Sequence, residues 1–287
     1  MMNFFLVSTE HLENALLFQD EDDYRAAMNL VAICAYTTGV KVIAFILMSN
    51  HVHFILMCSR EESKLFIDRY KMFYGKHCSR KYGIREFLRR LDTDIRELYM
   101  DAESLPRGIA YVQMNCVAAN ITPSASLYPW GTGTAFFNAT PAGGLRIGKL
   151  PKRQQYKILH TKANLPGDYM LNDAGYIEPR SYIPVQFVEA IFRSPSRYNL
   201  FLNNSSKSKR RLDKAAAPSF SDYIVRQAVT DLASSLFRTD SFANLSFGQQ
   251  VELLRQLQRR FSADAKQLAR CSGLPMEDVS RMLDVFI

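Results

Sequence analysis

The sequence predicts an α+β protein, and three observations lead to that class. Residues 1–120 alternate between short apolar runs and longer segments with apolar side chains at helical spacing, in the order strand, helix, strand, strand, helix, strand, helix. Residues 121–215 are rich in Gly, Pro, Asn and Ser, which favour turns and loops. Residues 216–287 return to helical spacing. The order predicted for residues 1–120 contains the pattern β-α-β-β-α-β, which is typical of a ferredoxin-like antiparallel sheet with helices on one face.

The first elements can be placed from local signals. Asn3–Val7 is a short apolar run that predicts a strand, and the acidic run Asp20–Asp23 opens a helix that reaches about Tyr36. Carboxylates stabilise a helix N-terminus through the helix dipole, so this run is interpreted as a cap and not as a metal site. Gly39 would end the helix. Lys41–Met48 is nearly continuous hydrophobe, which is typical of a central strand buried on both faces.

A hairpin and two further helices follow. The dipeptide Ser49-Asn50 has turn chemistry, so the next strand, His51–Cys58, is expected to pair with the one before it. Glu61–Tyr82 predicts a long helix and Phe87–Leu98 a further strand. Proline is favoured in the first turn of a helix, and a helix is expected over Pro106–Ala119.

The Glu61–Tyr82 helix interleaves basic and aromatic residues. That pattern suits a nucleic-acid face, and it suits equally a solvated face opposite an ordinary core stripe. Tyr70 and Tyr74 on this helix are interpreted as packing or base-stacking residues, because no ligand-type residue lies one turn from either. DNA contacts are expected from one turn residue and five basic side chains of the helix: Asn50, Arg69, Lys71, Lys76, Arg80 and Lys81.

The last part of the chain resembles a helix-turn-helix. Ser262–Asp264 gives an N-cap signal, a helix runs to Arg270, and a turn at Cys271–Gly273 leads to a second helix from Pro275. The second helix opens with Glu277-Asp278, which would repel phosphates, so packing or protein interaction is as open as DNA binding. We expect three parts in all: an α+β domain at 1–120, a loop-rich extension or insertion at 121–215, and a helical region at 216–287.

Composition narrows the class of protein. The chain has 287 residues, 47% of them hydrophobic, with a net charge of +8 and a pI of about 9.2. The basic excess points weakly to a polyanion such as nucleic acid, and a basic enzyme with no such partner fits it as well. Five cysteines without a Cys-x-x-Cys motif argue against a disulfide framework and fit a reducing cytoplasm. Polar residues interrupt the most apolar window, Val40–Met57, so no membrane span is expected.

Two short patterns predict chemistry. Side chains alternate along a strand, so His51 and His53 point to the same face, where two imidazoles can share a metal ion. Structural histidines remain an alternative for this pair. On the helix that follows, Tyr111 and Asn115 are four residues apart and so share a face, where they offer a phenolic oxygen and a carbonyl ligand. Gln113 would face away from them.

These segments resemble a known family. Residues 48–56, MSNHVHFIL, resemble the M-P-N-H-V-H-L-L-L box of the HUH single-tyrosine transposases. Residues 111–119, YVQMNCVAA, resemble the Y-I-x-x-N-P-V-R-A box of the REP-associated tyrosine transposases within that superfamily. Residues 128–130, YPW, are similar to their Y-P-W, and residues 268–280 to the helix-turn-helix tail of some relatives. The likeness covers residues 1 to about 130, which makes 1–120 the expected catalytic domain.

The resemblance implies a metal-dependent transposase that cleaves and rejoins single-stranded DNA at hairpin-bearing ends. Tyr111 would be the nucleophile and would form a 5′-phosphotyrosine. His51, His53 and Asn115 would hold a divalent cation, Mg²⁺ or Mn²⁺, although two nitrogens would also suit Zn²⁺. The implied partner is single-stranded or hairpin DNA in the cytoplasm of a prokaryotic cell, without a membrane, and the chain would act as a monomer or homodimer.

The sequence departs from the family boxes at three positions. Ser49 and Cys116 stand where Pro is usual, and Ala118 stands where Arg is usual, which removes a charge that could contact DNA. None of these removes a group that the chemistry needs. Two other functions therefore stay open: a DNA-binding protein that keeps the transposase fold without cleavage, and a metalloenzyme with a His-x-His site and no nucleic acid.

Overall fold

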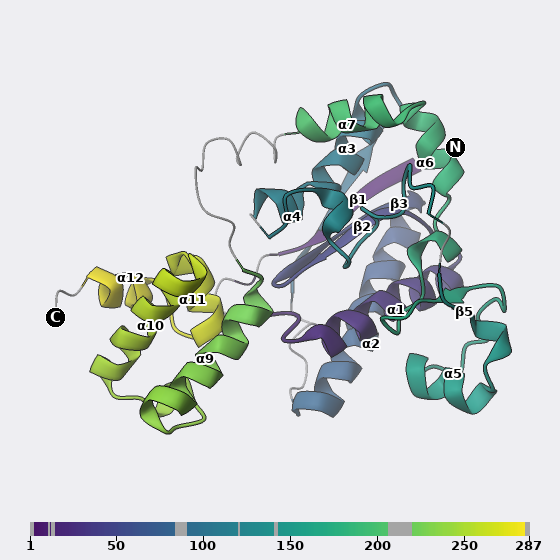
Figure 1. Cartoon of the computed structure of the whole chain (residues 1–287). Coiled ribbons are helices and arrows are strands. Elements are labelled where there is room, and N and C mark those ends of the chain that lie inside the picture. The colour runs from purple at the N-terminus through teal and green to yellow at the C-terminus, as the bar shows by residue number, and fades with distance from the viewer. Residues whose placement is uncertain are drawn as a thin grey trace.

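A four-stranded antiparallel sheet forms the centre of the molecule (Figure 1). The computed structural model describes residues 3–10, 12, 15–83, 91–119, 121–140, 143–205 and 220–284. The strand order is β2-β3-β1-β4. The strands are β1 (Asn3–Thr9), β2 (Lys41–Met48), β3 (His51–Cys58) and β4 (Thr93–Leu98). This is the order of the predicted ferredoxin-like unit, and the α+β class is confirmed. Residues 84–90, with which the predicted strand Phe87–Leu98 begins, lie outside the described residues.

Two helices, α1 (Glu21–Thr38) and α2 (Arg60–Tyr82), pack on one face of the sheet. Phe54 of β3 contacts the rings of Phe66 and Tyr70 of α2, with centroids 5.3 and 5.2 Å apart. The acidic run caps α1 as predicted, because the Asp20 carboxylate accepts a hydrogen bond from the Asp23 backbone. A capping box at Ser59 opens α2 in the same way.

The opposite face of the sheet is also covered. Every residue from His51 to Leu56 is buried, so β3 needs a neighbour on both sides. The helix α3 (Ser104–Gln113) supplies it, and Gly108 lets the helix come close, since a Cβ there would lie 2.7 Å from the Leu98 side chain. The prediction of helices on one face of the sheet therefore holds only for α1 and α2, the helices of the β-α-β-β-α-β unit. The third helix, α3, covers the other face.

The predicted central strand β2 lies at the edge of the sheet. It is nevertheless buried, because residues 128–132 run along its outer side. The Leu47 backbone donates to the Trp130 carbonyl at 2.8 Å, and the Thr132 backbone donates to the Phe45 carbonyl at 3.0 Å. A Cβ on Gly131 would lie 2.7 Å from the Phe45 oxygen, so the approach requires glycine. An edge strand that a loop covers in this way has the same continuous apolar sequence as a central strand.

The middle of the chain packs on the sheet. Its rings and aliphatic groups, among them Trp130, Phe136, Tyr176 and Phe192, belong to the same buried cluster as the strands. Two α-helices interrupt the segment that was expected to be loop-rich, α5 (Lys152–Leu159) and α6 (Val185–Phe192). The other elements are η2 (Ala125–Leu127), β5 (Leu145–Arg146), η3 (Ile147–Lys149), β6 (Met170–Leu171), η4 (Pro179–Ser181) and α7 (Pro195–Asn203). Residues 121–205 thus share a core with residues 3–119.

The C-terminal helices have a core of their own, built on side chains such as Val251, Leu254, Leu268 and Val279. Asp264 caps the third of these α-helices, and Gly273, with φ of 76°, ends it. The elements are α9 (Asp222–Phe237), η5 (Phe242–Asn244), α10 (Phe247–Phe261), α11 (Ala265–Ser272) and α12 (Met276–Asp284). No disulfide joins any of the five cysteines. No helix among the described residues is long and apolar enough to cross a membrane.

A buried carboxylate ties α1 to α2. Asp23 is fully buried, and its two oxygens lie within 3.0 Å of the His77 imidazole, the Lys81 ammonium and the Tyr82 hydroxyl. Burial raises the pKa of Asp23, but the hydrogen bonds from His77, the Gln19 backbone, Lys81 and Tyr82 outweigh it and leave the pKa below its ordinary value. The carboxylate is therefore stable in the core as a charged group.

Asp23→Asn is expected to lower the free energy of unfolding by about 3 kcal/mol, because it removes the buried charged acceptor of the hydrogen bonds from His77, Lys81 and Tyr82. The lowered pKa also predicts that this contribution is complete above about pH 4, the ordinary carboxyl range, and is lost as the pH falls through the pKa of the folded state. Urea unfolding at pH 7 and pH 3 measures both effects. Asp22→Asn is the control, since that exposed carboxylate pairs only with Arg25 and should change stability by about 0.5 kcal/mol or less.

Candidate functional site

The predicted histidine pair lies on the face of the sheet that α3 covers. His51 and His53 are 5% and 3% exposed, with ring centroids 4.8 Å apart and planes at 85°. Both point away from α2, because Phe54, which follows His53, contacts that helix, and neighbouring residues of a strand point to opposite faces. The pair therefore has the common orientation that strand alternation predicts.

Tyr111 reaches this pair from α3. Its ring meets the His53 ring edge to face, with centroids 5.5 Å apart and planes at 80°. The tyrosine is half-buried, so its ring is held by the core while part of it faces solvent. Three of the predicted site residues, which are far apart in the sequence, are thus neighbours in space.

Asn50 has a role that the sequence does not reveal. Its amide Nδ2 donates to the Leu12 carbonyl at 2.9 Å, which turns Oδ1 towards His51 Nδ1, 2.8 Å away. Since that oxygen accepts only, Nδ1 of His51 carries the hydrogen, and in the neutral imidazole the lone pair is on Nε2. Within the chain the Asn50 side chain orients His51, and its predicted contact with DNA stays a prediction.

The helix that carries Tyr111 does not continue smoothly to Asn115. It is interrupted at Met114, and the short helix α4 (Asn115–Ala118) follows, where one helix over Pro106–Ala119 was predicted. The Asn115 amide Nδ2 donates to the Tyr111 carbonyl at 2.9 Å and to the Val112 carbonyl at 3.3 Å. The side chain thus satisfies backbone groups at the interruption and holds the turn of Tyr111 in place.

The amide of Asn115 uses its nitrogen in both of these bonds, which leaves Oδ1 at the other end of the group as the atom with ligand chemistry. Gln113 faces away, as predicted, and its Nε2 donates to Thr132 Oγ1 at 2.7 Å. The competing tyrosines are packing residues: Tyr70 and Tyr74 are buried, and burial raises the pKa of each well above its ordinary value. Neither phenol is suited to attack a substrate.

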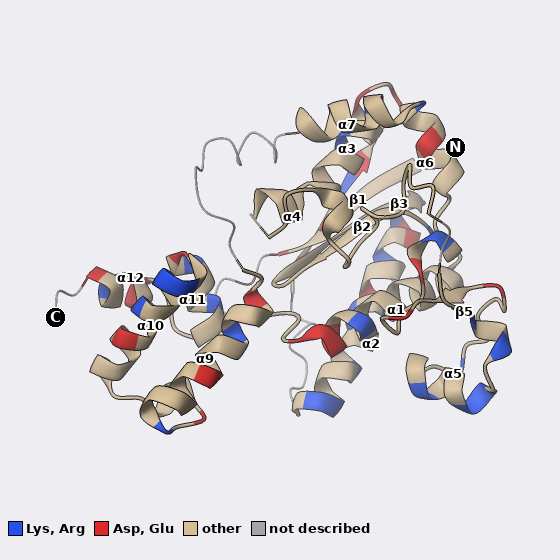
Figure 2. Cartoon of the chain, in the orientation of Figure 1, with Lys and Arg blue, Asp and Glu red and all other residues tan. Residues whose placement is uncertain are grey.

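The basic helix α2 lies on the other face of the sheet from Tyr111. Figure 2 shows its Lys and Arg residues below the sheet and α3 above it. Arg69 and Lys71 donate to backbone carbonyl oxygens at 2.8 and 2.7 Å, and Lys81 pairs with Asp20 at 2.6 Å. These three of the predicted DNA contacts are engaged within the chain. The other two, Lys76 and Arg80, line a cavity between α1, α2 and the end of α5.

A second cavity lies beside Tyr111, between α3, the end of β4 and α7. Its volume is about 780 Å³, and Arg107, Phe201 and Asn204 line it together with Tyr111. Arg107 is one helical turn before Tyr111 on the same face, and its side chain is 69% exposed and pairs with Glu103 at 2.8 Å. Arg107 was not among the residues predicted from the sequence. Its position four residues before Tyr111 places it on the same helix face and could have predicted that the two side chains are neighbours.

The turn that carries the histidine pair is fastened to the C-terminal helices. Asp222, the first residue of α9, is 4% exposed and accepts a hydrogen bond from Ser49 Oγ at 2.5 Å. Arg270 binds both oxygens of the same carboxylate, at 2.8 and 3.2 Å, and Gln267 donates to it at 2.8 Å. These hydrogen bonds offset the cost of burying the charged carboxylate. The two parts of the molecule therefore meet at a polar contact one residue from Asn50.

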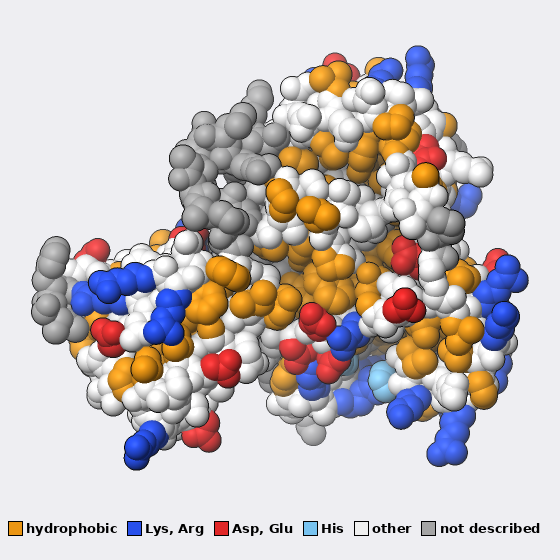
Figure 3. Space-filling model, in the orientation of Figure 1, with side chains coloured by type: hydrophobic (Ala, Val, Ile, Leu, Met, Phe, Trp, Pro, Cys, Tyr) orange, Lys and Arg blue, Asp and Glu red, His pale blue; other side chains and the backbone are white. Residues whose placement is uncertain are grey.

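An apolar hollow surrounds this contact. Figure 3 shows hydrophobic side chains between the C-terminal helices and the rest of the molecule, and the cavity there measures about 390 Å³. Trp130, Tyr128 and Ile224 are among the residues that line it. The backbone oxygen of Ser49 also accepts from the Leu17 and Phe18 amides at 2.6 and 3.1 Å. The turn before His51 is thus held from three sides.

The residues present fit a metal ion in chemical type. Two imidazoles with perpendicular planes and one amide oxygen make a mixed nitrogen and oxygen set that suits a divalent cation with open positions for a substrate. The Asn50–His51 hydrogen bond fixes the His51 tautomer, as partners of metal-binding histidines usually do. Among the described residues, no group of three His, Cys, Asp or Glu side chains could hold a metal. A third ligand beside the histidine pair would therefore have to come from another type of side chain, such as an amide.

The chain was compared with family models, curated proteins and solved structures. No family model matches the chain, and no curated protein matches it in sequence. Part of the chain is similar to a solved structure of a REP-associated tyrosine transposase bound to a REP hairpin. The match covers 46% of this chain and 76% of that one, with 11% sequence identity and a TM-score of 0.36. A similarity of this size does not establish a shared fold.

Ser49→Ala is expected to lower the free energy of unfolding by about 2 kcal/mol, because it removes a donor from a buried carboxylate. Urea unfolding measures the loss. Ser126→Ala is the matched control, since that exposed hydroxyl bonds only to Ser124 and its removal should change stability little. Equal stability of the two variants would mean that Asp222 does not depend on Ser49.

Proposed function

We propose that the chain is a metal-dependent DNA strand transferase that nicks and rejoins single-stranded DNA through a covalent bond to Tyr111. The observation that carries the proposal is the contact between the Tyr111 and His53 rings, which sets a phenol beside a pair of buried imidazoles. The family resemblance of residues 48–56 and 111–119 supplies the type of reaction. Hairpin-bearing ends are the proposed substrate, and the prokaryotic cytoplasm is the proposed location.

The proposed reaction exchanges one phosphate ester for another. Tyr111 Oη forms a bond to phosphorus while the bond from phosphorus to the 3′ oxygen breaks, which gives a 5′-phosphotyrosine and a free 3′-OH. The phenolic proton passes to solvent, and the departing 3′ oxygen takes a proton from solvent. Attack of a 3′-OH on the phosphotyrosine reverses the exchange and joins a strand. The number of ester bonds is unchanged in each step, so no external energy source is required.

The side chains of this site would divide the work. His51, His53 and Asn115 Oδ1 would hold Mg²⁺ or Mn²⁺, with Asn50 orienting His51. When bound, a divalent cation there would neutralise charge on the scissile phosphate. Asn115 Nδ2 fixes the backbone of Tyr111 and so aims the phenol. Arg107, exposed one turn before Tyr111, would contact a phosphate of the strand in the adjoining cavity.

A DNA-binding protein that does not cleave is the second candidate. Two observations favour it. The Asn115 amide is already hydrogen-bonded to the helix backbone, so the two imidazoles are better placed than Asn115 to bind a metal ion. Ala118 also lacks the charge of the arginine that stands in the family box. Both candidates bind DNA, and they differ in whether Tyr111 becomes covalently attached.

Tyr111→Phe is expected to abolish covalent capture of DNA while leaving DNA binding within about twofold, since it removes one oxygen and keeps the ring contact with His53. The measurement incubates the chain with a panel of labelled single-stranded hairpins and Mn²⁺ and follows the protein–DNA adduct on a denaturing gel. Tyr99→Phe, an exposed tyrosine outside the site, is the control and should retain the adduct.

The outcomes separate the candidates. An adduct in the Tyr111→Phe variant would show that another residue is the nucleophile. Binding without any adduct in the unmodified chain would establish the non-cleaving protein. An absence of salt-dependent DNA affinity would leave a metalloenzyme that does not act on nucleic acid.

Asn50→Ala is expected to weaken Mn²⁺ binding by roughly 10- to 100-fold, because it frees the ring of His51 from its orienting hydrogen bond. Mn²⁺ affinity can be measured by titration calorimetry or by the electron paramagnetic resonance signal of the free ion. His51→Ala should weaken binding further, and Asp168→Asn, an exposed carboxylate far from the pair in sequence, is the control for non-specific sites. Unchanged affinity in the two test variants would place the metal elsewhere.

A further inference from the structure

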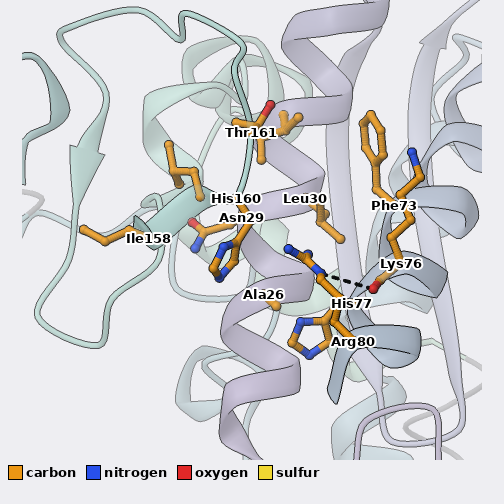
Figure 4. A pocket seen from close by; sticks show the side chains of 12 residues that line it. Ala26, Asn29, Leu30, Phe73, Lys76, His77, Arg80, Ile158, His160 and Thr161 are labelled. Atoms are coloured by element: carbon orange, nitrogen blue, oxygen red, sulfur yellow. Dashed lines mark hydrogen bonds between the residues drawn. The ribbon is translucent and has the colours of Figure 1, made fainter. Parts of the chain in front are cut away.

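A cavity unrelated to Tyr111 lies on the opposite face of the sheet, between α1, α2 and the end of α5. Its volume is about 140 Å³, and it adjoins a more open hollow of about 470 Å³. The two spaces share six lining residues, so they form one continuous depression: Ala26, Asn29, His77, Arg80, Ile158 and His160. Figure 4 shows Arg80 and His160 reaching into it from α2 and from the segment after α5.

The lining of the smaller cavity combines an apolar wall with positive charge. Leu30, Ile33 and Phe73 form part of the wall. Four side chains that carry or can carry positive charge line the same space: Lys76, His77, Arg80 and His160. Among the described residues, no carboxylate lines this cavity. Asp22, which lines the adjoining hollow, already pairs with Arg25.

The charges of Lys76 and Arg80 are not neutralised by acidic partners in the described part of the chain. Arg80 Nε donates to the Lys76 backbone carbonyl at 3.3 Å, and the Lys76 ammonium lies 5.5 Å from the centre of the Phe73 ring. Both contacts are with neutral groups, so each cation keeps its charge for a ligand. This distinguishes them from Lys81, which pairs with Asp20 and Asp23.

His77 and His160 are both fixed in position. His77 Nε2 is 2.8 Å from the buried Asp23 carboxylate, and the side chain is 16% exposed. His160 ends α5 with a left-handed backbone, φ of 51°, and its amide donates to the Tyr156 carbonyl at 2.8 Å. Burial, Arg80 and His77 lower the pKa of His160, so the local field is positive. An anion in the cavity would relieve that field.

Positive charge continues outside the cavity. The helix α5, whose end lines the cavity, carries the exposed basic residues Lys152, Arg153 and Lys157, and its ribbon is partly blue in Figure 2. A ligand with a single phosphate needs only the residues in the cavity. A strand of nucleotides would also use the side chains on α5, because its charges repeat along the chain.

We propose that this cavity binds a nucleotide, with the phosphate held by Arg80 and His160 and the base or sugar against the apolar wall at Phe73. A bare phosphate would leave that wall without a partner, and an apolar ligand would leave two cations facing an empty space. The nucleotide is either a free nucleoside monophosphate or a unit of a single strand. The site lies across the sheet from Tyr111, so it is independent of the proposed cleavage.

The test uses the full chain with Tyr111→Phe, so that binding is measured without cleavage. Thymidine monophosphate, thymidine, inorganic phosphate and the tetranucleotide (dT)₄ are titrated in turn and followed by amide chemical shifts and calorimetry. Thymidine monophosphate should bind saturably and at least tenfold more tightly than thymidine or inorganic phosphate. Failure of the nucleotide to outbind inorganic phosphate would overturn the nucleotide assignment.

Two variants locate the site. Arg80→Gln and His160→Asn should each weaken thymidine monophosphate at least tenfold; Asn is chosen because it tolerates the left-handed backbone at position 160. Arg80→Lys keeps a charge and should recover part of the affinity, and thermal unfolding confirms that each variant is folded. Lys64→Gln, an exposed lysine of α2 outside the cavity, is the matched control.

The ligand series also identifies the source of the nucleotide. Tighter binding of (dT)₄ than of the mononucleotide, lost again in Arg80→Gln, supports a single strand that continues along α5. Equal binding of the two supports a free nucleotide. Affinities that Arg80→Gln and His160→Asn leave within twofold of the parent would overturn the proposal.

Discussion

The burial of β3 on both faces is the constraint on which the rest of the structure depends. Its alternate side chains belong to two different environments, with Val52 and Phe54 towards α1 and α2 and with His51 and His53 towards α3. A shift of one residue in the pairing of this strand would exchange the two sets and place imidazoles in the apolar core. The turn before the strand, the helix that covers the histidines and the site itself all depend on that single register.

Much of the fold could be predicted because it depends on local periodicity. Short segments of sequence determine the helices α1 and α2, the cap at Asp20 and the hairpin at Ser49-Asn50. The edge position of β2 could not be predicted, because residues 128–132, which cover it, follow only after two more strands and three α-helices. Burial by a distant loop and burial by a neighbouring strand leave the same apolar pattern.

Part of the candidate site could be predicted from the sequence, and part of it depends on tertiary packing. Alternation placed the two histidines on one face, and the family resemblance pointed to Tyr111, but the contact between them needed the packing of α3 across the sheet. The interruption at Met114 depends on a side chain bonding to the backbone, which spacing alone does not show. The side on which the basic residues of α2 would lie also depended on tertiary packing. As a result, the five basic residues of α2 that were expected to contact DNA lie on the opposite face of the sheet from Tyr111.

Ser49 connects the turn before the histidine pair to the C-terminal helices through its bond to Asp222. A proline at this position has no hydroxyl and could not bond to Asp222, so a chain with proline here would leave a buried carboxylate one donor short. Selection would then act on the two positions as a pair. Among descendants of a common ancestor, serine at position 49 should accompany an acidic residue at position 222, and lineages that dropped the C-terminal helices should be free to carry proline.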